Sequence, residues 1–103
     1  MKFSEVGLDK NIQKSIKDLG FEILTPIQKE AIPYLLKNTT DLIALAQTGT
    51  GKTAAFVIPS LEHVDTTKDY IQALILLPTR ELALQTSSVV KALGKYMNLE
   101  CMV

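Results

Sequence analysis

The sequence predicts an α/β fold in which a parallel sheet has helices on its faces. Helix-like segments alternate with short apolar segments, giving the order β-α-β-α-β with right-handed crossovers expected. The continuous Leu/Ile run over 72–77 is typical of a strand that is buried on both faces. With 103 residues, the chain corresponds to one small domain or to part of one.

Two helices are expected before the first strand. Apolar residues recur at helical spacing from Leu8 to Leu19, and Gly20 follows as a stop. The second helix begins at Pro26 and is expected to break or kink near Pro33. The later elements are expected to be a strand over 41–46, a helix from 53 to about 61, a loop over 63–70, a strand over 72–77, a long helix from about 82 to 97 and a third strand beginning at 99.

The segment between the first strand and the next helix is the most informative part of the chain. It reads Ala46, Gln47, Thr48, Gly49, Thr50, Gly51, Lys52, Thr53. A strand, a glycine-rich loop, Lys-Thr and a helix form the context of a phosphate-binding P-loop, although Ala46 replaces the usual first glycine. Gly49 and Gly51 can take positive φ, so that backbone N–H groups surround an anion.

Two residues of this loop are the candidate catalytic residues. Lys52 would contact the β- and γ-phosphates of a nucleotide, and the Thr53 hydroxyl would bind Mg²⁺. The loop therefore predicts binding of a nucleoside triphosphate, and the alternative is an ordinary Gly/Thr turn.

The segment over 20–28 permits two interpretations. Thr25 and Gln28 fit a capping box at a helix that starts with Pro26. The Gln28 carboxamide also has the donor and acceptor needed to bind N6 and N7 of adenine. A third segment, 78–83, follows the second strand, and locally it predicts a helix start capped by Thr79.

Taken together in this order, the three segments resemble the DEAD-box family of ATP-dependent RNA helicases. Residues 20–28 are similar to the family's Q motif, 46–53 to its motif I, which characteristically begins with Ala, and 78–83 to its motif Ia. Phe3 lies 17 residues before Gly20, where the family has an aromatic residue. One departure is Leu24, where the family usually has proline, and a slightly looser turn is expected there.

The resemblance implies a role for each matched residue. Phe3 would stack on adenine, Gln28 would hydrogen-bond the edge of the base, and Thr25 would brace the P-loop. Pro78, Thr79 and Arg80 would contact an RNA backbone, and an internal salt bridge is the alternative for Arg80. ATP and Mg²⁺ are the implied cofactors, and RNA is the implied partner.

The resemblance also implies a domain organisation. Residues 1–40 would form a helical Q-motif region, and residues 41–103 the first part of a RecA-like ATP-binding domain that stops before the Walker-B (Asp-Glu-Ala-Asp) motif. The full-length protein would be an ATP-dependent RNA helicase, and this chain alone would lack turnover. An unpaired edge at 41–46 would favour homodimers or exchange of elements between copies.

Composition restricts the remaining possibilities. Lys+Arg and Asp+Glu number 11 each, which argues against binding nucleic acid by bulk charge. A lone Cys101 is typical of a reducing cytoplasm, no apolar run predicts a membrane span, and His63 has no partner at metal-ligand spacing. A P-loop small-molecule kinase and a non-catalytic nucleotide-binding module remain the competing functions.

Overall fold

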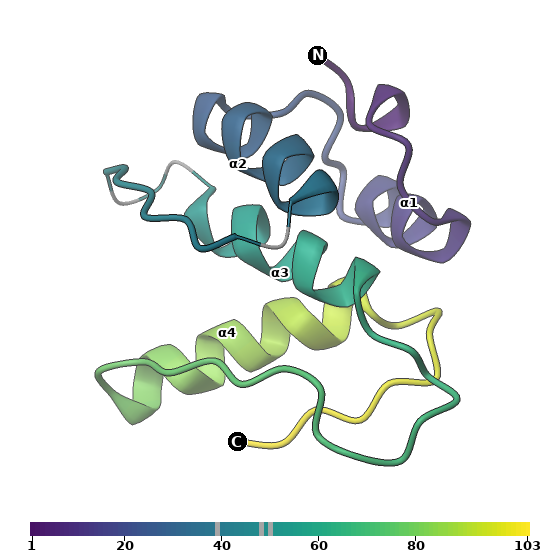
Figure 1. Cartoon of the computed structure of the whole chain (residues 1–103), viewed down its shortest axis with the longest axis vertical. Helices are drawn as coiled ribbons and strands as arrows, with labels where there is room; N and C mark the ends of the chain where they lie inside the picture. Colours follow the sequence, from purple (N-terminus) through teal and green to yellow (C-terminus); the bar gives the residue numbers. More distant parts are fainter. Residues whose placement is uncertain (39, 48, 50) are drawn as a thin grey trace.

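The computed structural model describes residues 1–38, 40–47, 49 and 51–103. Thr48 and Thr50 of the predicted P-loop lie outside the described residues. The described part contains a short 3₁₀ helix and four α-helices: η1 (Phe3–Glu5), α1 (Lys10–Asp18), α2 (Pro26–Lys37), α3 (Lys52–Glu62) and α4 (Arg80–Leu93). Figure 1 shows α3 between α2 and α4, with α1 beside them. Each helix expected from the sequence is present, although α4 ends at Leu93 rather than near residue 97. The proline in α2 lies inside the helix rather than ending it.

The core fills the space between these helices. Burial of apolar side chains removes hydrocarbon from water and is the main favourable contribution to packing here. The fully buried side chains, in chain order, are Ile12, Ser15, Ile16, Ile32, Val57, Ile58 and Leu93. All four helices therefore contribute to one core, and α3 lies at its centre because six of its 11 residues are buried between its neighbours.

The N-terminal residues pair with the segment that precedes α2. Phe3 N–H donates to the Glu22 carbonyl at 3.0 Å, and Leu24 N–H donates to the Met1 carbonyl at 3.0 Å. Proline at position 24 could not make the second bond because it has no N–H. The departure from the family pattern therefore gives this turn an additional tie to the N-terminus.

The predicted sheet is not formed in the described residues. The segments over 41–46, 72–77 and 99–103 are extended chain without a ladder of hydrogen bonds, and the β pairing found among the described residues is one antiparallel bridge between Lys2 and Ile23. Apolar side chains on these segments lie in solvent, with Ile43 exposed over 89% and Leu76 over 84%. A parallel strand is stable when it is paired with another strand and covered on both faces. Among the described residues these segments have no strand partner, and only Ile75, Leu99 and Cys101 pack against the core. The expectation of a formed parallel sheet is therefore not confirmed in the described residues.

The C-terminal end of α1 is joined to the turn after α4. The Tyr96 hydroxyl donates to the Asp18 carboxylate, and the Lys95 ammonium lies 2.9 Å from the same group. These contacts, first from Tyr96 and then from Lys95, hold the pKa of Asp18 below its ordinary value. Lys14 lies 4.3 Å from the centre of the Tyr96 ring and adds a cation–π contact.

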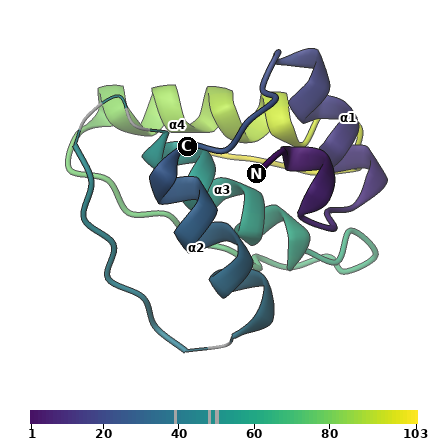
Figure 2. The same ribbon diagram turned by 90° about the horizontal axis from the view of Figure 1, so that it is seen from above.

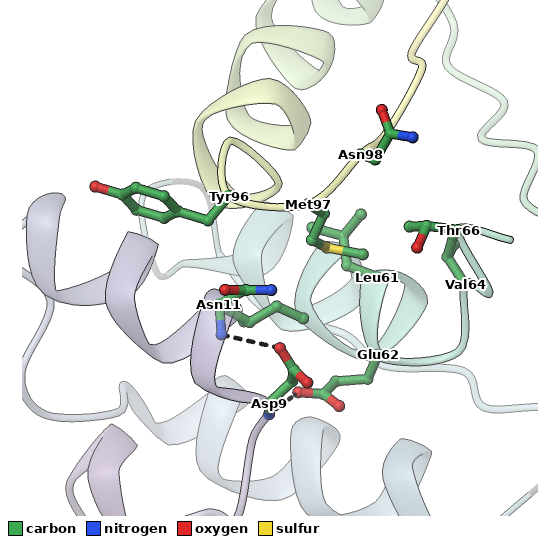
Figure 3. A pocket seen from close by; sticks show the side chains of 10 residues that line it. Asp9, Asn11, Leu61, Glu62, Val64, Thr66, Tyr96, Met97 and Asn98 are labelled. Carbon is green, nitrogen blue, oxygen red and sulfur yellow. Dashed lines mark hydrogen bonds between the residues drawn. The ribbon is translucent and has the colours of Figure 1, made fainter.

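The N-terminal end of α1 is joined to the C-terminal end of α3. Asp9 caps α1 by accepting from Asn11 N–H at 2.9 Å, and its own N–H donates to Glu62 Oε1 at 2.6 Å (Figure 3). A hollow of about 220 Å³ lies beside this contact, between α1, α3 and the turn after α4. No helix within the described residues is long and apolar enough to cross a bilayer.

Candidate nucleotide-binding site

Three helices begin on one side of the molecule. The N-terminal ends of α2, α3 and α4 face the same side in Figure 1, and Figure 2 agrees. A helix N-terminus carries a partial positive charge and free N–H groups, so it attracts anions. The three predicted motifs therefore lie on the side of the molecule where α2, α3 and α4 begin, which is the positive end of each helix.

The described part of the glycine-rich loop has the backbone conformation predicted from the sequence. Gly49 has φ of +81° and Gly51 has φ of +85°, both in the left-handed region. Gly51 is the N-cap of α3 and makes no side-chain cap, so the first N–H groups of the helix are not occupied by a capping side chain. The loop and the helix together offer donors of the kind that bind phosphate.

Gln28 joins the start of α2 to this loop. Its side chain is 4% exposed. The amide oxygen accepts from Thr25 N–H at 3.0 Å, and Nε2 donates to the Gly51 carbonyl at 3.2 Å. Thr25 Oγ1 in turn accepts from Gln28 N–H at 3.4 Å, which completes the predicted capping box. Gln28 therefore caps α2 and also contacts the loop.

The approach of α2 to Gly51 leaves no room for a side chain there. A Cβ placed on Gly51 would lie 2.4 Å from Gln28 Nε2 and 3.1 Å from Thr25 Oγ1. At Gly49, by contrast, a Cβ would meet no atom within 4 Å. The two glycines thus share a left-handed backbone, but only Gly51 is packed against the capping box.

The cationic side chains at these helix starts have no internal anionic partner in the part of the chain that the structure describes. Lys52 is exposed at the first position of α3 and makes no ion pair or side-chain hydrogen bond with any described residue. A positive charge at the positive end of a helix is locally unfavourable, so this position favours a bound anion. Thr53 follows, half-buried, and Ala46 and Gln47 lie in the extended chain before the loop.

The predicted RNA-contacting residues lie at the start of α4. Pro78, Thr79 and Arg80 are all exposed. Thr79 is the N-cap, and its Oγ1 accepts from Leu82 N–H at 3.2 Å. Arg80 forms no salt bridge with a carboxylate of the described residues, so the internal ion pair considered for it is not formed there.

The two N-terminal aromatic residues lie together. Phe3 is 4% exposed and stacks on Phe21, with ring centroids 6.3 Å apart and ring planes 27° apart. Phe21 is 43% exposed. In this conformation Phe3 presents little of its ring to a ligand, and Phe21 is the aromatic side chain of this pair that solvent reaches.

Comparison with known proteins agrees with the motifs. The sequence profile described as DEAD/DEAH box helicase matches residues 25–103. The chain belongs to the DEAD/DEAH box helicase family. It is 57% identical, over 99% of its length, to the putative ATP-dependent RNA helicase ste13 of Schizosaccharomyces pombe, and covers 21% of that protein. It is 54% identical, over 98% of its length, to the ATP-dependent RNA helicase DHH1 of Meyerozyma guilliermondii, and covers 18% of it.

A solved helicase structure is also similar. The structure of S. cerevisiae Dbp5 bound to RNA and ADP BeF3 superposes with a TM-score of 0.90 at 42% identity, covering 94% of this chain and 25% of that one. The chain thus spans about a fifth to a quarter of the relatives that it matches.

Two contacts of this DEAD-box site had no signal in the sequence. The Gln28–Gly51 bond joins residues 23 apart, and no local pattern predicts which carbonyl the amide reaches. Phe21 lies inside the 20–28 segment and 18 residues after Phe3, and no local pattern predicts that the two rings meet. Its contact with Phe3 required the tertiary fold.

Proposed function

We propose that this chain is the ATP-binding N-terminal part of a DEAD-box RNA helicase, which unwinds or remodels RNA at the expense of ATP in the full-length protein. The observation that carries the proposal is the bond from Gln28 Nε2 to the Gly51 carbonyl. It joins the side chain that we propose binds adenine to the loop that we propose binds the phosphates. The relatives are named as ATP-dependent RNA helicases, which supports the same activity.

Gln28 retains the groups that adenine requires. A carboxamide has two N–H donors and two acceptor lone pairs. The contacts with Gly51 and Thr25 use one of each. The second N–H and the second lone pair are a matched pair for N7 and N6 of the base, so capping α2 and binding adenine are compatible roles.

The phosphates would lie at the start of α3. Gly49, Gly51 and the first N–H groups of α3 would surround them, with the loop residues Ala46, Gln47, Thr48 and Thr50 completing the segment. Lys52 would neutralise charge on the β- and γ-phosphates. Thr25 would support the loop, and Phe3 would act through the aromatic pair that it forms with Phe21.

Mg²⁺ would enter with ATP. The Thr53 hydroxyl makes no side-chain hydrogen bond within the described residues, so it is available as a ligand. The same residues contain no cluster of three or more His, Cys, Asp or Glu that could hold a metal ion without the nucleotide. The ion would neutralise charge on the phosphate oxygens.

RNA would bind at the start of α4. Pro78, Thr79 and Arg80 are exposed, and Arg80 has no internal carboxylate partner among the described residues. Contact with a phosphate backbone fits an arginine at a helix N-terminus and does not select a base sequence.

The remaining assignments follow from this function. Residues 1–40 would be the Q-motif region and residues 41–103 the first part of a RecA-like domain with a parallel sheet in the full-length protein. A cytoplasmic location fits the lone Cys101. The Gln28 and Arg80 segments favour a helicase over a P-loop small-molecule kinase, which needs neither.

We also propose that isolated copies associate. The extended segments over 41–46 and 72–77 expose apolar side chains, and their backbone groups form no hydrogen bond with one another or with the helices among the described residues. Exposed edges of this kind pair with other chains, so homodimers or copies that exchange elements are expected.

Titration of ATP and GTP tests the nucleotide site. Lys52→Ala should lower the affinity for both nucleotides about 10- to 150-fold, because a charge-assisted contact contributes about 1.5–3 kcal/mol to binding. Gln28→Ala should instead reduce the difference between the affinities for ATP and for GTP. The matched control is Gln13→Ala, since Gln13 also donates its amide to a carbonyl, that of Leu8 at 2.9 Å, but lies on α1. Equal affinity of the unaltered chain for ATP and GTP would contradict adenine recognition by Gln28.

A further inference from the structure

We propose that α1 and the turn after α4 form a second surface for an RNA backbone, apart from the start of α4. Its centre is a row of three exposed lysines on α1, Lys10, Lys14 and Lys17. Lys95 and Tyr96, in the turn after α4, extend it. We name these residues the lysine surface. The inference rests on the proposed function, because the proposed helicase activity supplies RNA as the ligand.

The three lysines of α1 lie on one face of the helix. At 3.6 residues per turn they fall within about 60° of one another around the axis, and they span about 10 Å along it. The buried residues of α1 are Ile12, Ser15 and Ile16, which lie on the opposite side of the helix. The lysines therefore project into solvent, away from the core.

This face differs from an ordinary solvated helix face in its signs of charge. Exposed helices usually carry both signs, which pair at spacings of three and four residues. Between Lys10 and Lys17 the chain has no Asp or Glu, so neighbouring lysines at those spacings repel one another. Lys10 and Lys17 make no ion pair or side-chain hydrogen bond with any residue that the structure describes. A bound anion would neutralise this charge.

The carboxylate at the end of α1 is already paired. Asp18 accepts a hydrogen bond from the Tyr96 hydroxyl and lies 2.9 Å from the Lys95 ammonium. Its negative charge consequently offsets that of Lys95. The three lysines of α1 keep their positive charge uncompensated.

Tyr96 joins the two elements of the lysine surface. Lys14 Nζ lies 4.3 Å from the centre of the Tyr96 ring, and Lys95 Nζ lies 5.0 Å from it. Cations within about 6 Å of an aromatic ring are attracted to it, so one ring positions two ammonium groups. Side chains that are already held in place lose less conformational freedom when they bind a ligand.

The position of the lysine surface favours RNA over other polyanions. Arg80 is the first residue of α4, and the turn with Lys95 follows the last. The 14 residues of α4 extend about 20 Å, a distance that a short RNA strand spans. α1 lies beside the C-terminal end of this helix (Figure 1). Lysines contact phosphates as point charges and do not select a base sequence, so the surface would add affinity without sequence preference.

The salt dependence of RNA binding tests the proposal. For a single strand, the slope of log K against log salt concentration is about −0.7 for each neutralised phosphate. Lys10→Gln combined with Lys17→Gln should therefore make the slope about 1.4 shallower and lower the affinity at low salt. Fluorescence anisotropy of the whole chain with a labelled oligouridine long enough to span α4 measures both.

Two control variants isolate the position of the charge. Lys37→Gln combined with Lys68→Gln removes the same charge from exposed lysines outside the lysine surface, and it should leave the slope unchanged. Lys10→Arg combined with Lys17→Arg keeps the charge and should retain the slope of the parent chain. Equal slopes for the two glutamine variants would overturn the proposal.

Arg80→Gln distinguishes this inference from the proposed function. If the RNA contact at the start of α4 is wrong, Arg80→Gln binds oligouridine like the parent chain, while the Lys10 and Lys17 variant still shows the shallower slope. A shallower slope for Arg80→Gln alone would overturn the lysine surface and leave the contact at α4 standing. Release of oligouridine by polyglutamate at a lower concentration of charge than by unlabelled oligouridine would assign the surface to an acidic protein, which also overturns the proposal.

Discussion

Gln28 serves two neighbours with one side chain. Its amide caps α2 through Thr25 and contacts the Gly51 carbonyl, while the whole side chain is almost fully buried. Buried amides are stable when their donors and acceptors are paired. A substitution that moves the Gly51 carbonyl should therefore also move the Gln28 side chain. The position of this amide is therefore coupled to the conformation of the loop.

Substitution of Gly51 by alanine tests this coupling. Gly51→Ala places a Cβ 2.4 Å from Gln28 Nε2, so the amide must move and its bond to the loop is lost. We expect a loss of ATP affinity and a decrease of about 1–3 kcal/mol in the free energy of unfolding from the overpacking, beyond the cost of the left-handed backbone. Urea unfolding and ATP titration measure the two effects.

Gly49→Ala is the matched control. Gly49 has nearly the same φ, but a Cβ there meets no atom within 4 Å, so this variant carries the backbone strain alone. Equal effects of the two substitutions on stability would show that the Gln28 contact contributes nothing.

At the scale of elements, α1 is held to the end of α4 by one buried hydroxyl. Ser15 is fully buried, and its Oγ lies 2.6 Å from the Leu93 carbonyl and 2.8 Å from the Ile12 carbonyl. Leu93 is the last residue of α4, so its carbonyl has no partner within the helix. The serine therefore satisfies an acceptor that is otherwise buried and unpaired.

Ser15→Ala should lower the free energy of unfolding by about 1–3 kcal/mol, because it leaves the Leu93 carbonyl buried without a donor. Denaturant unfolding followed by far-UV circular dichroism measures the change. Ser88→Ala is the control, since the Ser88 hydroxyl is exposed and bonds only within α4, to the Leu84 carbonyl at 3.1 Å. A Ser15 variant as stable as the Ser88 variant would contradict the proposed tie between α1 and α4.

At the scale of the whole molecule, the helices form a core while the extended segments remain exposed. Ile43, Leu45 and Leu76 each project most of their side chain into solvent. Extended chain that exposes apolar side chains and has no strand partner favours pairing with other copies, so the fraction of associated chain should depend on concentration.

We expect sedimentation to show dimers or larger species whose fraction rises with concentration. Leu45→Lys should shift the population toward monomer, because a charge on an exposed edge opposes pairing. Leu19→Lys is the control, as Leu19 is partly exposed but lies after α1, outside the extended segments. A single monomer boundary in sedimentation at all concentrations, together with cooperative unfolding and a large free energy of unfolding, would contradict association.

The chain by itself should not hydrolyse ATP. Phosphoryl transfer requires an acidic group that holds Mg²⁺, a residue that orients the attacking water and an arginine finger, in addition to the phosphate cradle. The 103 residues contain no Asp-Glu-Ala-Asp sequence, and their one arginine, Arg80, lies at the start of α4. Loss of the arginine finger alone reduces turnover by about 10³–10⁵-fold.

Phosphate release at saturating ATP and Mg²⁺, with RNA present, measures this directly, and Lys52→Ala supplies the background rate. Release above that background would show that a carboxylate of this chain takes the catalytic role.

The sequence determined the helices, their caps and the loop conformation by itself. Thr25, Pro26 and Thr79 fix helix starts through local geometry, and glycines at positions 49 and 51 permit the left-handed backbone that was expected. These features depend on residues close together in the chain, so a pattern of a few residues is sufficient to predict them. The family resemblance had the same origin, because its three motifs are short and local.

Only the tertiary structure decided which distant groups meet and whether the strands form a sheet. The bonds from Gln28 to Gly51, Ser15 to Leu93 and His63 to Leu35 join residues far apart in sequence. The predicted strands were likewise not confirmed in the described residues, since a strand forms only where another strand lies beside it, and its own residues cannot supply that partner. Local patterns specify what a segment can become, whereas long-range hydrogen bonds and shared burial decide what it becomes.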